Sequence, residues 1–126
     1  MSNQAVSTQS APAAIGPYSQ AVQAGNTVYV SGQLPIDPAL GIFPGDDITA
    51  QTRQSLLNLQ AILTEAGMSM ANVVKTTVLL ADISDFSAMN EVYSTFFRAP
   101  YPARAAFQVA ALPKGAKVEI EAVAVK

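Results

Sequence analysis

Residues 116–125 read Ala116-Lys117-Val118-Glu119-Ile120-Glu121-Ala122-Val123-Ala124-Val125. Every second side chain, from Val118 to Ala124, is apolar, and this alternation predicts a β-strand with one fully buried face. The opposite face begins with charged side chains and ends with valines. Because charged groups are rarely buried unless they are paired or functional, we expect this second face to be part buried and part functional.

Four further segments have the composition of strands: residues 18–24, 27–33, 72–81 and 104–112. The first two are separated by Gly25-Asn26, a dipeptide typical of a two-residue β-hairpin turn.

Two segments have helical periodicity. The first, residues 48–66, follows a cap at Asp46 or Asp47 and precedes Gly67, which suits the left-handed position after a helix. The second follows a cap at Ser84 or Asp85 and ends near Arg98, before two prolines. The predicted order is therefore ββαβαββ, an α+β domain in which two helices cover one face of the sheet.

The length of 126 residues indicates one domain, which we place at residues 15–126. Residues 1–14 are rich in Ser, Gln and Ala, lack the pattern of a signal peptide, and are expected to form a flexible lead-in. Half of the residues are hydrophobic and only 13% are charged. Such a weakly charged surface predicts self-association.

The composition also argues against several functions. The net charge is −2 and the seven basic residues are scattered, which argues against a nucleic-acid partner. The sequence contains neither His nor Cys, so Ser-His-Asp triads, thiol nucleophiles and the usual zinc sites are excluded. We expect no membrane partner because no apolar run reaches spanning length, and the lack of cysteine fits a cytoplasmic location.

Arg104, in the stretch Pro102-Ala103-Arg104, is a candidate functional residue because this charged side chain begins a predicted strand. A guanidinium group presents a planar fork that grips a carboxylate through two hydrogen bonds. From the residues alone, a salt bridge in a subunit interface explains Arg104 equally well.

Seven motifs together resemble one known family. They are Gly16-Pro17-Tyr18-Ser19-Gln20-Ala21, Val30-Ser31-Gly32-Gln33, Gln51-Thr52-Arg53-Gln54, Val74-Lys75-Thr76-Thr77-Val78, Met89-Asn90-Glu91-Val92-Tyr93, Pro102-Ala103-Arg104 and Val118-Glu119-Ile120-Glu121-Ala122. In this order they resemble the YjgF/Rid family of reactive-intermediate imine deaminases, in its RidA-like subgroup. The resemblance extends from Ala13 to Lys126.

The resemblance implies a chorismate-mutase-like fold with one mixed sheet, assembled as a homotrimer around a central β-barrel. It also implies sites between subunits that hydrolyse 2-imino acids and their enamine tautomers, such as 2-iminobutanoate and 2-iminopropanoate, to 2-keto acids and ammonia. No metal or organic cofactor is implied. Two other functions stay open: a non-catalytic protein that binds keto acids or similar small carboxylates, and a ribonuclease or translation inhibitor, which the acidic composition disfavours.

For substrate binding, the resemblance implies that Arg104 holds the carboxylate. Gly32 and Ser31 match a second strand at the site, where the missing side chain of Gly32 lets a carboxylate reach a backbone N–H. Gly32 is equally explained as the glycine of a β-bulge, and the two interpretations are compatible.

For catalysis, the resemblance implies that Tyr18 orients substrate or water and that Glu119 positions the attacking water and accepts its proton. Glu121 is predicted to lie on the same strand face, and the residues alone do not separate these two glutamates. Ala106 occupies a site-lining position that carries Cys in some relatives, so we expect backbone contacts there and no thiol chemistry.

Overall fold

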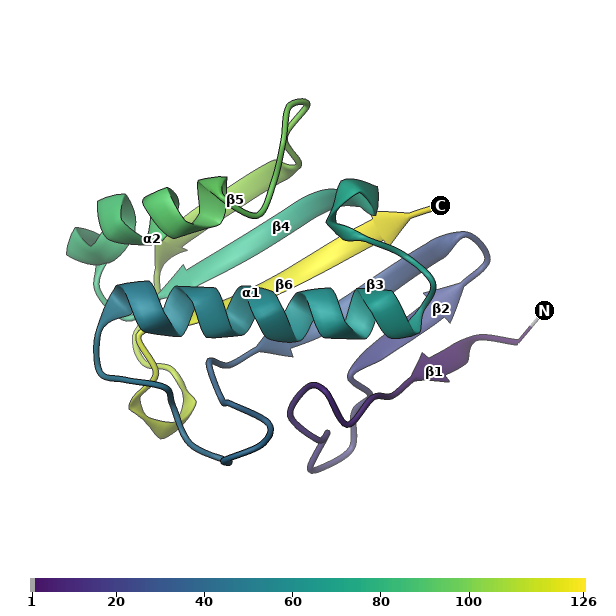
Figure 1. The fold of residues 1–126 in the computed structure, drawn as a ribbon, viewed down its shortest axis with the longest axis horizontal. Helices are drawn as coiled ribbons and strands as arrows, with labels where there is room; N and C mark the ends of the chain where they lie inside the picture. The colour runs from purple at the N-terminus through teal and green to yellow at the C-terminus, as the bar shows by residue number, and fades with distance from the viewer. Residues whose placement is uncertain (1) are drawn as a thin grey trace.

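The computed structural model describes residues 2–126 and contains one six-stranded sheet in the order β1-β2-β3-β6-β4-β5. Both α-helices lie on the same side of this sheet (Figure 1). The strands are β1 (Gln4–Val6), β2 (Ala21–Ala24), β3 (Thr27–Gln33), β4 (Val73–Leu80), β5 (Ala103–Gln108) and β6 (Val118–Val125), and the helices are α1 (Ile48–Glu65) and α2 (Phe86–Ser94). Among the strands of residues 2–126, only β4 and β5 pair in parallel, so the sheet is mixed. The predicted α+β class and the single helical layer are confirmed.

Strand β6 lies near the middle of the sheet, between β3 and β4. Its apolar face is buried beneath the helices, with Val118, Ile120 and Ala124 fully inaccessible. On the opposite, open face Glu121 is exposed and Glu119 is partly buried. The alternation predicted for residues 118–125 is therefore confirmed.

Helix α1 begins and ends as the sequence predicts. The Asp47 side chain caps it by accepting a hydrogen bond from the Ala50 N–H. At the other end Gly67 has a φ of 76°, and the Met68 N–H donates to the Leu63 carbonyl at 2.8 Å, which completes a Schellman motif. These ends fix the helix so that the apolar face of α1 packs on the sheet, with four side chains fully buried: Leu56, Leu59, Ile62 and Leu63.

Three predicted boundaries are too generous. The first predicted strand loses residues 18–20, because Tyr18 turns back and its N–H donates to the Gly16 carbonyl. Helix α2 ends at Ser94, four residues early, and the chain then turns to bury Phe97. Strand β5 ends at Gln108, four residues before the predicted end.

The expected flexible lead-in is in part a strand, which the sequence analysis missed. Residues 4–6 pair with β2, and Val6 and Ala11 join the hydrophobic core. The buried side chain of Gln20 fastens this segment: its amide nitrogen contacts the carbonyl oxygens of Thr8, Ala11 and Pro12, and its oxygen accepts from the Thr8 N–H. One buried amide therefore replaces the backbone pairing that residues 8–12 lack.

We predict that Gln20→Ala destabilises the protein by about 1–3 kcal/mol, because it leaves buried backbone groups without hydrogen-bond partners. Urea unfolding measures this loss. Gln23→Ala is the matched control, since the Gln23 amide makes one exposed hydrogen bond, to Gly25, and its removal is expected to cost less than about 0.5 kcal/mol. Equal losses in the two variants would contradict the role given to Gln20.

Candidate active site

The structure places Arg104 and Glu119 on opposite faces of the sheet. Arg104 of β5 is in register with Thr76 of β4, which in turn pairs with Ala122 of β6, and Thr76 and Ala122 are buried under the helices. Glu119 is in register with Leu79, so it points to the open face. Within one chain the two predicted residues therefore line different cavities.

Arg104 lies against helix α2. Its Nη1 donates a hydrogen bond to Oδ1 of Asn90 at 2.7 Å, and its Cζ lies 4.7 Å from the ring centre of Tyr93 and 5.4 Å from that of Phe86. The side chain is otherwise exposed, at the edge of a cavity of about 460 Å³ that Tyr101 and other residues line. The guanidinium group is thus held by one edge and one face while the rest of its fork faces solvent.

Tyr93 is buried beneath this guanidinium group. Its hydroxyl and the Thr76 Oγ1 form a hydrogen bond of 2.7 Å. Burial raises the pKa of the Tyr93 phenol, although the hydrogen bond shared with Thr76 and the charge of Arg104 act in the opposite direction. The phenol is therefore neutral at physiological pH and links helix α2 to strand β4.

A second cavity, of about 690 Å³, lies at the end of strand β3. It brings together four of the predicted site residues: Tyr18, Ser31, Gly32 and Glu119. Glu121 also lines it, as do apolar side chains from three loops, among them Ile15, Ile36 and Pro113. Ala106 lines neither cavity; it shares the strand face of Arg104 and packs against the hydrophobic core.

The space around residue 32 in this cavity has no room for a side chain. Residues 31 and 32 together face Glu121 in a β-bulge, between the register pairs Val30–Ala122 and Gln33–Ile120. A Cβ atom on Gly32 would overlap Oε2 of Glu119 and lie 2.9 Å from its Cδ. The absence of a side chain on Gly32 is therefore what makes room for the Glu119 carboxylate.

The environments of the two glutamates differ. Burial raises the pKa of Glu119, and the negative charge of Glu121 raises it further. Glu121 is exposed on the same face. A carboxylate that is partly dehydrated and repelled by a neighbour is the stronger base, so the environment favours Glu119 as a proton acceptor.

Among residues 2–126 there is no group of three or more His, Cys, Asp or Glu side chains placed to hold a metal ion. Over the same residues, no helix combines the length and the hydropathy of a membrane span.

Comparison with known proteins gives one consistent result. A family model described as Endoribonuclease L-PSP matches residues 8–126. A 2-iminobutanoate/2-iminopropanoate deaminase from Capra hircus is 58% identical over 121 residues, which are 96% of this chain and 88% of that protein. The chain belongs to the YjgF/Rid family.

Solved structures of the Rid family agree with the fold. RidA from the Antarctic bacterium Psychrobacter sp. PAMC 21119 superimposes with a TM-score of 0.92 at 52% identity, covering 98% of this chain and 99% of that chain. TdcF from E. coli, crystallised with bound serine, has a TM-score of 0.93 at 48% identity and 98% coverage of both chains. The expected α+β fold, with one mixed sheet and two helices, therefore matches that of solved relatives.

The support of Arg104 by helix α2 could not be expected from the motifs. It comes from Phe86, Asn90 and Tyr93. Their spacing of i, i+4 and i+7 puts all three on one helical stripe, which is the signal that points to a shared partner. That the partner is Arg104 follows only from the packing of α2 beside β5.

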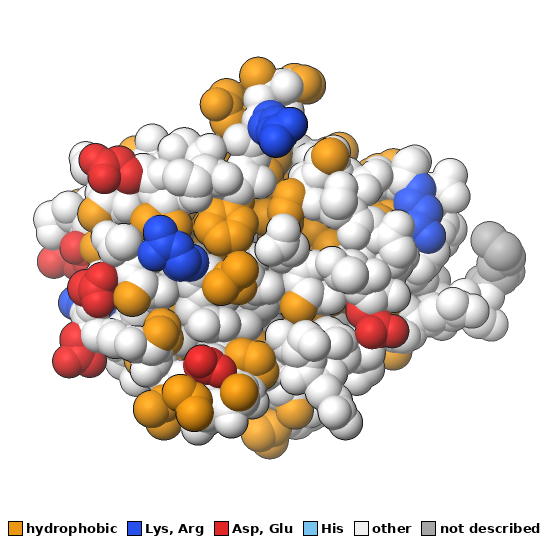
Figure 2. All heavy atoms as spheres, viewed as in Figure 1, with side chains coloured by type: hydrophobic (Ala, Val, Ile, Leu, Met, Phe, Trp, Pro, Cys, Tyr) orange, Lys and Arg blue, Asp and Glu red, His pale blue; other side chains and the backbone are white. Residues whose placement is uncertain are grey.

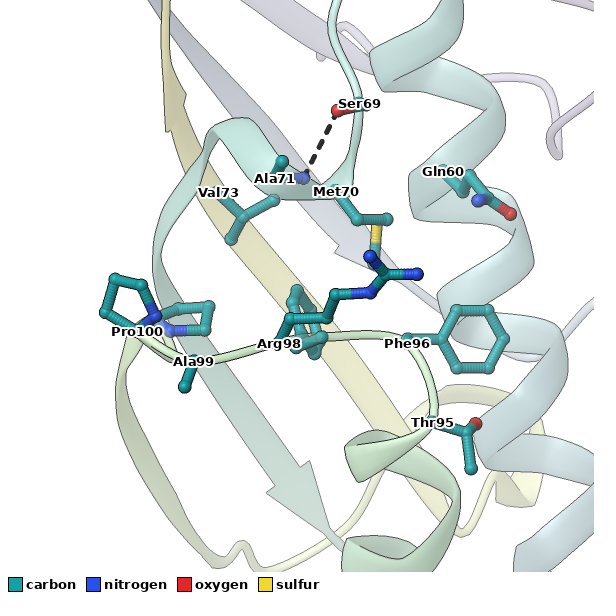
Figure 3. A pocket seen from close by; sticks show the side chains of 12 residues that line it. Gln60, Ser69, Met70, Ala71, Val73, Thr95, Phe96, Arg98, Ala99 and Pro100 are labelled. Carbon is teal, nitrogen blue, oxygen red and sulfur yellow. Dashed lines mark hydrogen bonds between the residues drawn. The ribbon is translucent and has the colours of Figure 1, made fainter.

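A third cavity, of about 660 Å³, lies between α1, the short 3₁₀ turn Met70–Asn72 and the loop after α2. Figure 3 shows the Arg98 side chain extending into it beside Met70 and Phe96. It contains none of the predicted site residues.

We predict that Gly32→Ala lowers the turnover number of the enzyme at least about 10-fold with little loss of stability. The new Cβ displaces the flexible Glu119 carboxylate and does not push against the backbone.

Gly25→Ala is the converse control. Gly25 has a φ of 60° with no atom near its would-be Cβ, so this variant is expected to lose about 1 kcal/mol of stability and no activity. Steady-state kinetics and thermal melts distinguish the two, and full activity in Gly32→Ala would contradict the steric argument.

We predict that Glu119→Gln raises the melting temperature at pH 7. A carboxyl group whose pKa is raised by folding binds its proton more tightly in the folded state, so its ionisation destabilises the fold as the pH rises through that pKa. The gain is therefore expected to shrink as the pH falls below the raised pKa of Glu119. Melting curves from pH 4 to 8 test this, with the exposed Glu91→Gln as control; a gain that is independent of pH would be contrary evidence.

Proposed function

We propose that this protein hydrolyses 2-imino acids and their enamine tautomers, such as 2-iminobutanoate and 2-iminopropanoate, to 2-keto acids and ammonia. The observation that carries the proposal is that one chain presents both an Arg104 guanidinium group open to solvent and a partly buried Glu119 carboxylate that lines a cavity and has a raised pKa. A 2-imino acid presents the two groups that such residues recognise, a carboxylate and an adjacent electrophilic carbon. Identity of 58% to a protein named for this activity supports the same conclusion.

We further propose that the complete site forms between two copies of the chain, in a homotrimer around a central β-barrel. Arg104 and Glu119 lie on opposite faces of one sheet, so a substrate that touches both requires a second copy. The open face also supports association, because it exposes Tyr29, Phe107 and Val125 by 53%, 47% and 37%.

In the proposed mechanism, Arg104 binds the substrate carboxylate through its fork, and the backbone N–H at Gly32 assists. The Tyr18 hydroxyl orients the imine, and Ser31 helps to shape the strand end that receives it. This binding fixes the C2 carbon relative to a water molecule beside Glu119, and orientation of this kind supplies part of the rate increase.

Glu119 then moves the protons. Its carboxylate accepts a proton from water as the oxygen attacks C2 of the iminium group, which gives a carbinolamine with one hydroxyl and one amino group. The Glu119 carboxyl returns this proton to the amino group, the C–N bond breaks, and ammonia leaves. The hydroxyl proton then passes through the Glu119 carboxylate to the released ammonia, which departs as ammonium, so the keto acid is complete and Glu119 is again a carboxylate. General acid–base catalysis of this kind is worth about 10²–10⁴-fold.

A ribonuclease function, which the family description names, has little support in this chain. The net charge is −2 and histidine is absent from the sequence. On the helical side of the molecule the Lys and Arg side chains stand apart from one another (Figure 2). RNA binding depends on clustered positive charge.

A non-catalytic role in binding small carboxylates is the second candidate, because the related TdcF was crystallised with bound serine. The Glu119→Gln variant separates the two functions. A binding protein would keep its function in this variant, whereas a deaminase would lose turnover and retain affinity for the keto acid. The cytoplasmic location stays a prediction.

We predict that the purified protein shortens the lifetime of 2-iminobutanoate generated by an amino-acid oxidase, measured as less semicarbazone formed when semicarbazide competes for the imine. Arg104→Lys is the matched control, because it keeps the charge and loses the two-pronged grip. It is expected to lower kcat/KM about 10- to 100-fold. An imine lifetime that does not change on adding the wild-type protein would refute the deaminase function.

A further inference from the structure

Two aromatic rings of α2 lie against the Arg104 guanidinium group. The Cζ atom is 4.7 Å from the ring centre of Tyr93 and 5.4 Å from that of Phe86, so Tyr93 is the nearer ring. Tyr93 is only 5% exposed, so its ring is held in place by the surrounding core and does not move with the Arg104 side chain. Two contacts fix it: its hydroxyl bonds to Thr76, and its ring packs on that of Phe97 with 4.5 Å between centres. Arg104 therefore rests on a rigid surface.

The position of Thr76 makes this arrangement specific. Thr76 is the residue of β4 that pairs in register with Arg104 of β5. The hydroxyl of Tyr93 is thus anchored to the strand position directly beside the arginine that its ring supports. Any shift of α2 along the sheet would break the Tyr93–Thr76 hydrogen bond and remove the ring from beneath the guanidinium group.

We propose that Tyr93 is a positioning residue for substrate binding: its anchored ring fixes the plane of the Arg104 fork. This inference rests on the proposed role of Arg104 in holding the substrate carboxylate.

An arginine side chain without contacts samples many rotamers, so contacts that select one rotamer prepare it for binding. The hydrogen bond to Asn90 fixes one edge of the guanidinium group, and the Tyr93 ring fixes its face. Together the two contacts define a plane, and a carboxylate that binds two N–H groups must lie in that plane. A fork that is already ordered loses less entropy when the ligand binds, which increases affinity.

The contact with Phe86 is a weaker candidate for this role. Its ring is farther from the guanidinium group and is partly exposed, and a phenylalanine has no hydroxyl to anchor it to the sheet. We therefore assign to Tyr93 the larger share of the ordering.

The test measures, by calorimetry, the affinity of the protein for 2-ketobutanoate, the stable keto acid that hydrolysis of 2-iminobutanoate would give. Tyr93→Leu removes the aromatic face and is expected to raise both Kd and KM about 10-fold, with kcat within about twofold of wild type. Tyr93→Phe keeps the ring but loses its anchor to Thr76, so its Kd is expected to rise about threefold, between the values of wild type and Tyr93→Leu, while the lost hydrogen bond lowers the melting temperature.

Val92→Ala is the matched control for stability, because Val92 is the preceding residue of α2 and is equally buried. It is expected to lower the melting temperature and leave Kd unchanged. If Tyr93→Leu does not fold, Tyr93→Met, which keeps bulk without an aromatic face, carries the same expectation.

Two results would overturn the inference. The first is a wild-type Kd in Tyr93→Leu while Arg104→Ala binds weakly. The second is a Kd that follows the melting temperature across all variants, Val92→Ala included, because Tyr93 would then act only through stability. An unchanged Kd in Arg104→Ala has a different meaning: it refutes the carboxylate-binding role of Arg104, and with it the basis of this inference.

Discussion

The alternation of side chains along β-strands is the constraint on which the arrangement of this protein depends. It buries Thr76 and Ala122 beneath two helices and turns the neighbouring positions to the open face. Arg104 shares the first face and Glu119 the second. A single chain therefore carries the two groups that the proposed mechanism requires, but separates them by the thickness of its own sheet. The proposed enzyme needs assembly for this geometric reason.

Each of the two side chains in the proposed mechanism has neighbours that adjust its properties in a different way. Arg104 is held by the Asn90 amide and an aromatic face, so its charge stays available at the protein surface. Glu119 is partly buried in the space that Gly32 leaves free, and Glu121 repels its ionised form. One half of the site is thus ordered for binding, and the other is adjusted for proton transfer.

The parts of this fold that depend on local chemistry could be predicted from the sequence. The Asp47 cap, the left-handed Gly67 and the two-faced final strand follow from short-range rules, and the structure confirms them. Strand β1 could not be predicted, because three residues carry little periodicity and their order depends on pairing with residues 21–23 of β2. Motifs named the candidate site residues, but the steric need for a glycine beside Glu119 exists only after β3 and β6 pair.

The claim that two chains share each site is tested most directly by mixing two inactive variants. Arg104→Ala lacks the carboxylate fork and Glu119→Gln lacks the base, and each alone is expected to be inactive. When the two chains are co-expressed and assemble at random, about one quarter of the interfaces receive an intact Arg104 from one copy and an intact Glu119 from its neighbour. We predict that the mixed protein regains about a quarter of wild-type imine hydrolysis. Mixed assemblies that form but show no activity would contradict a site built between chains.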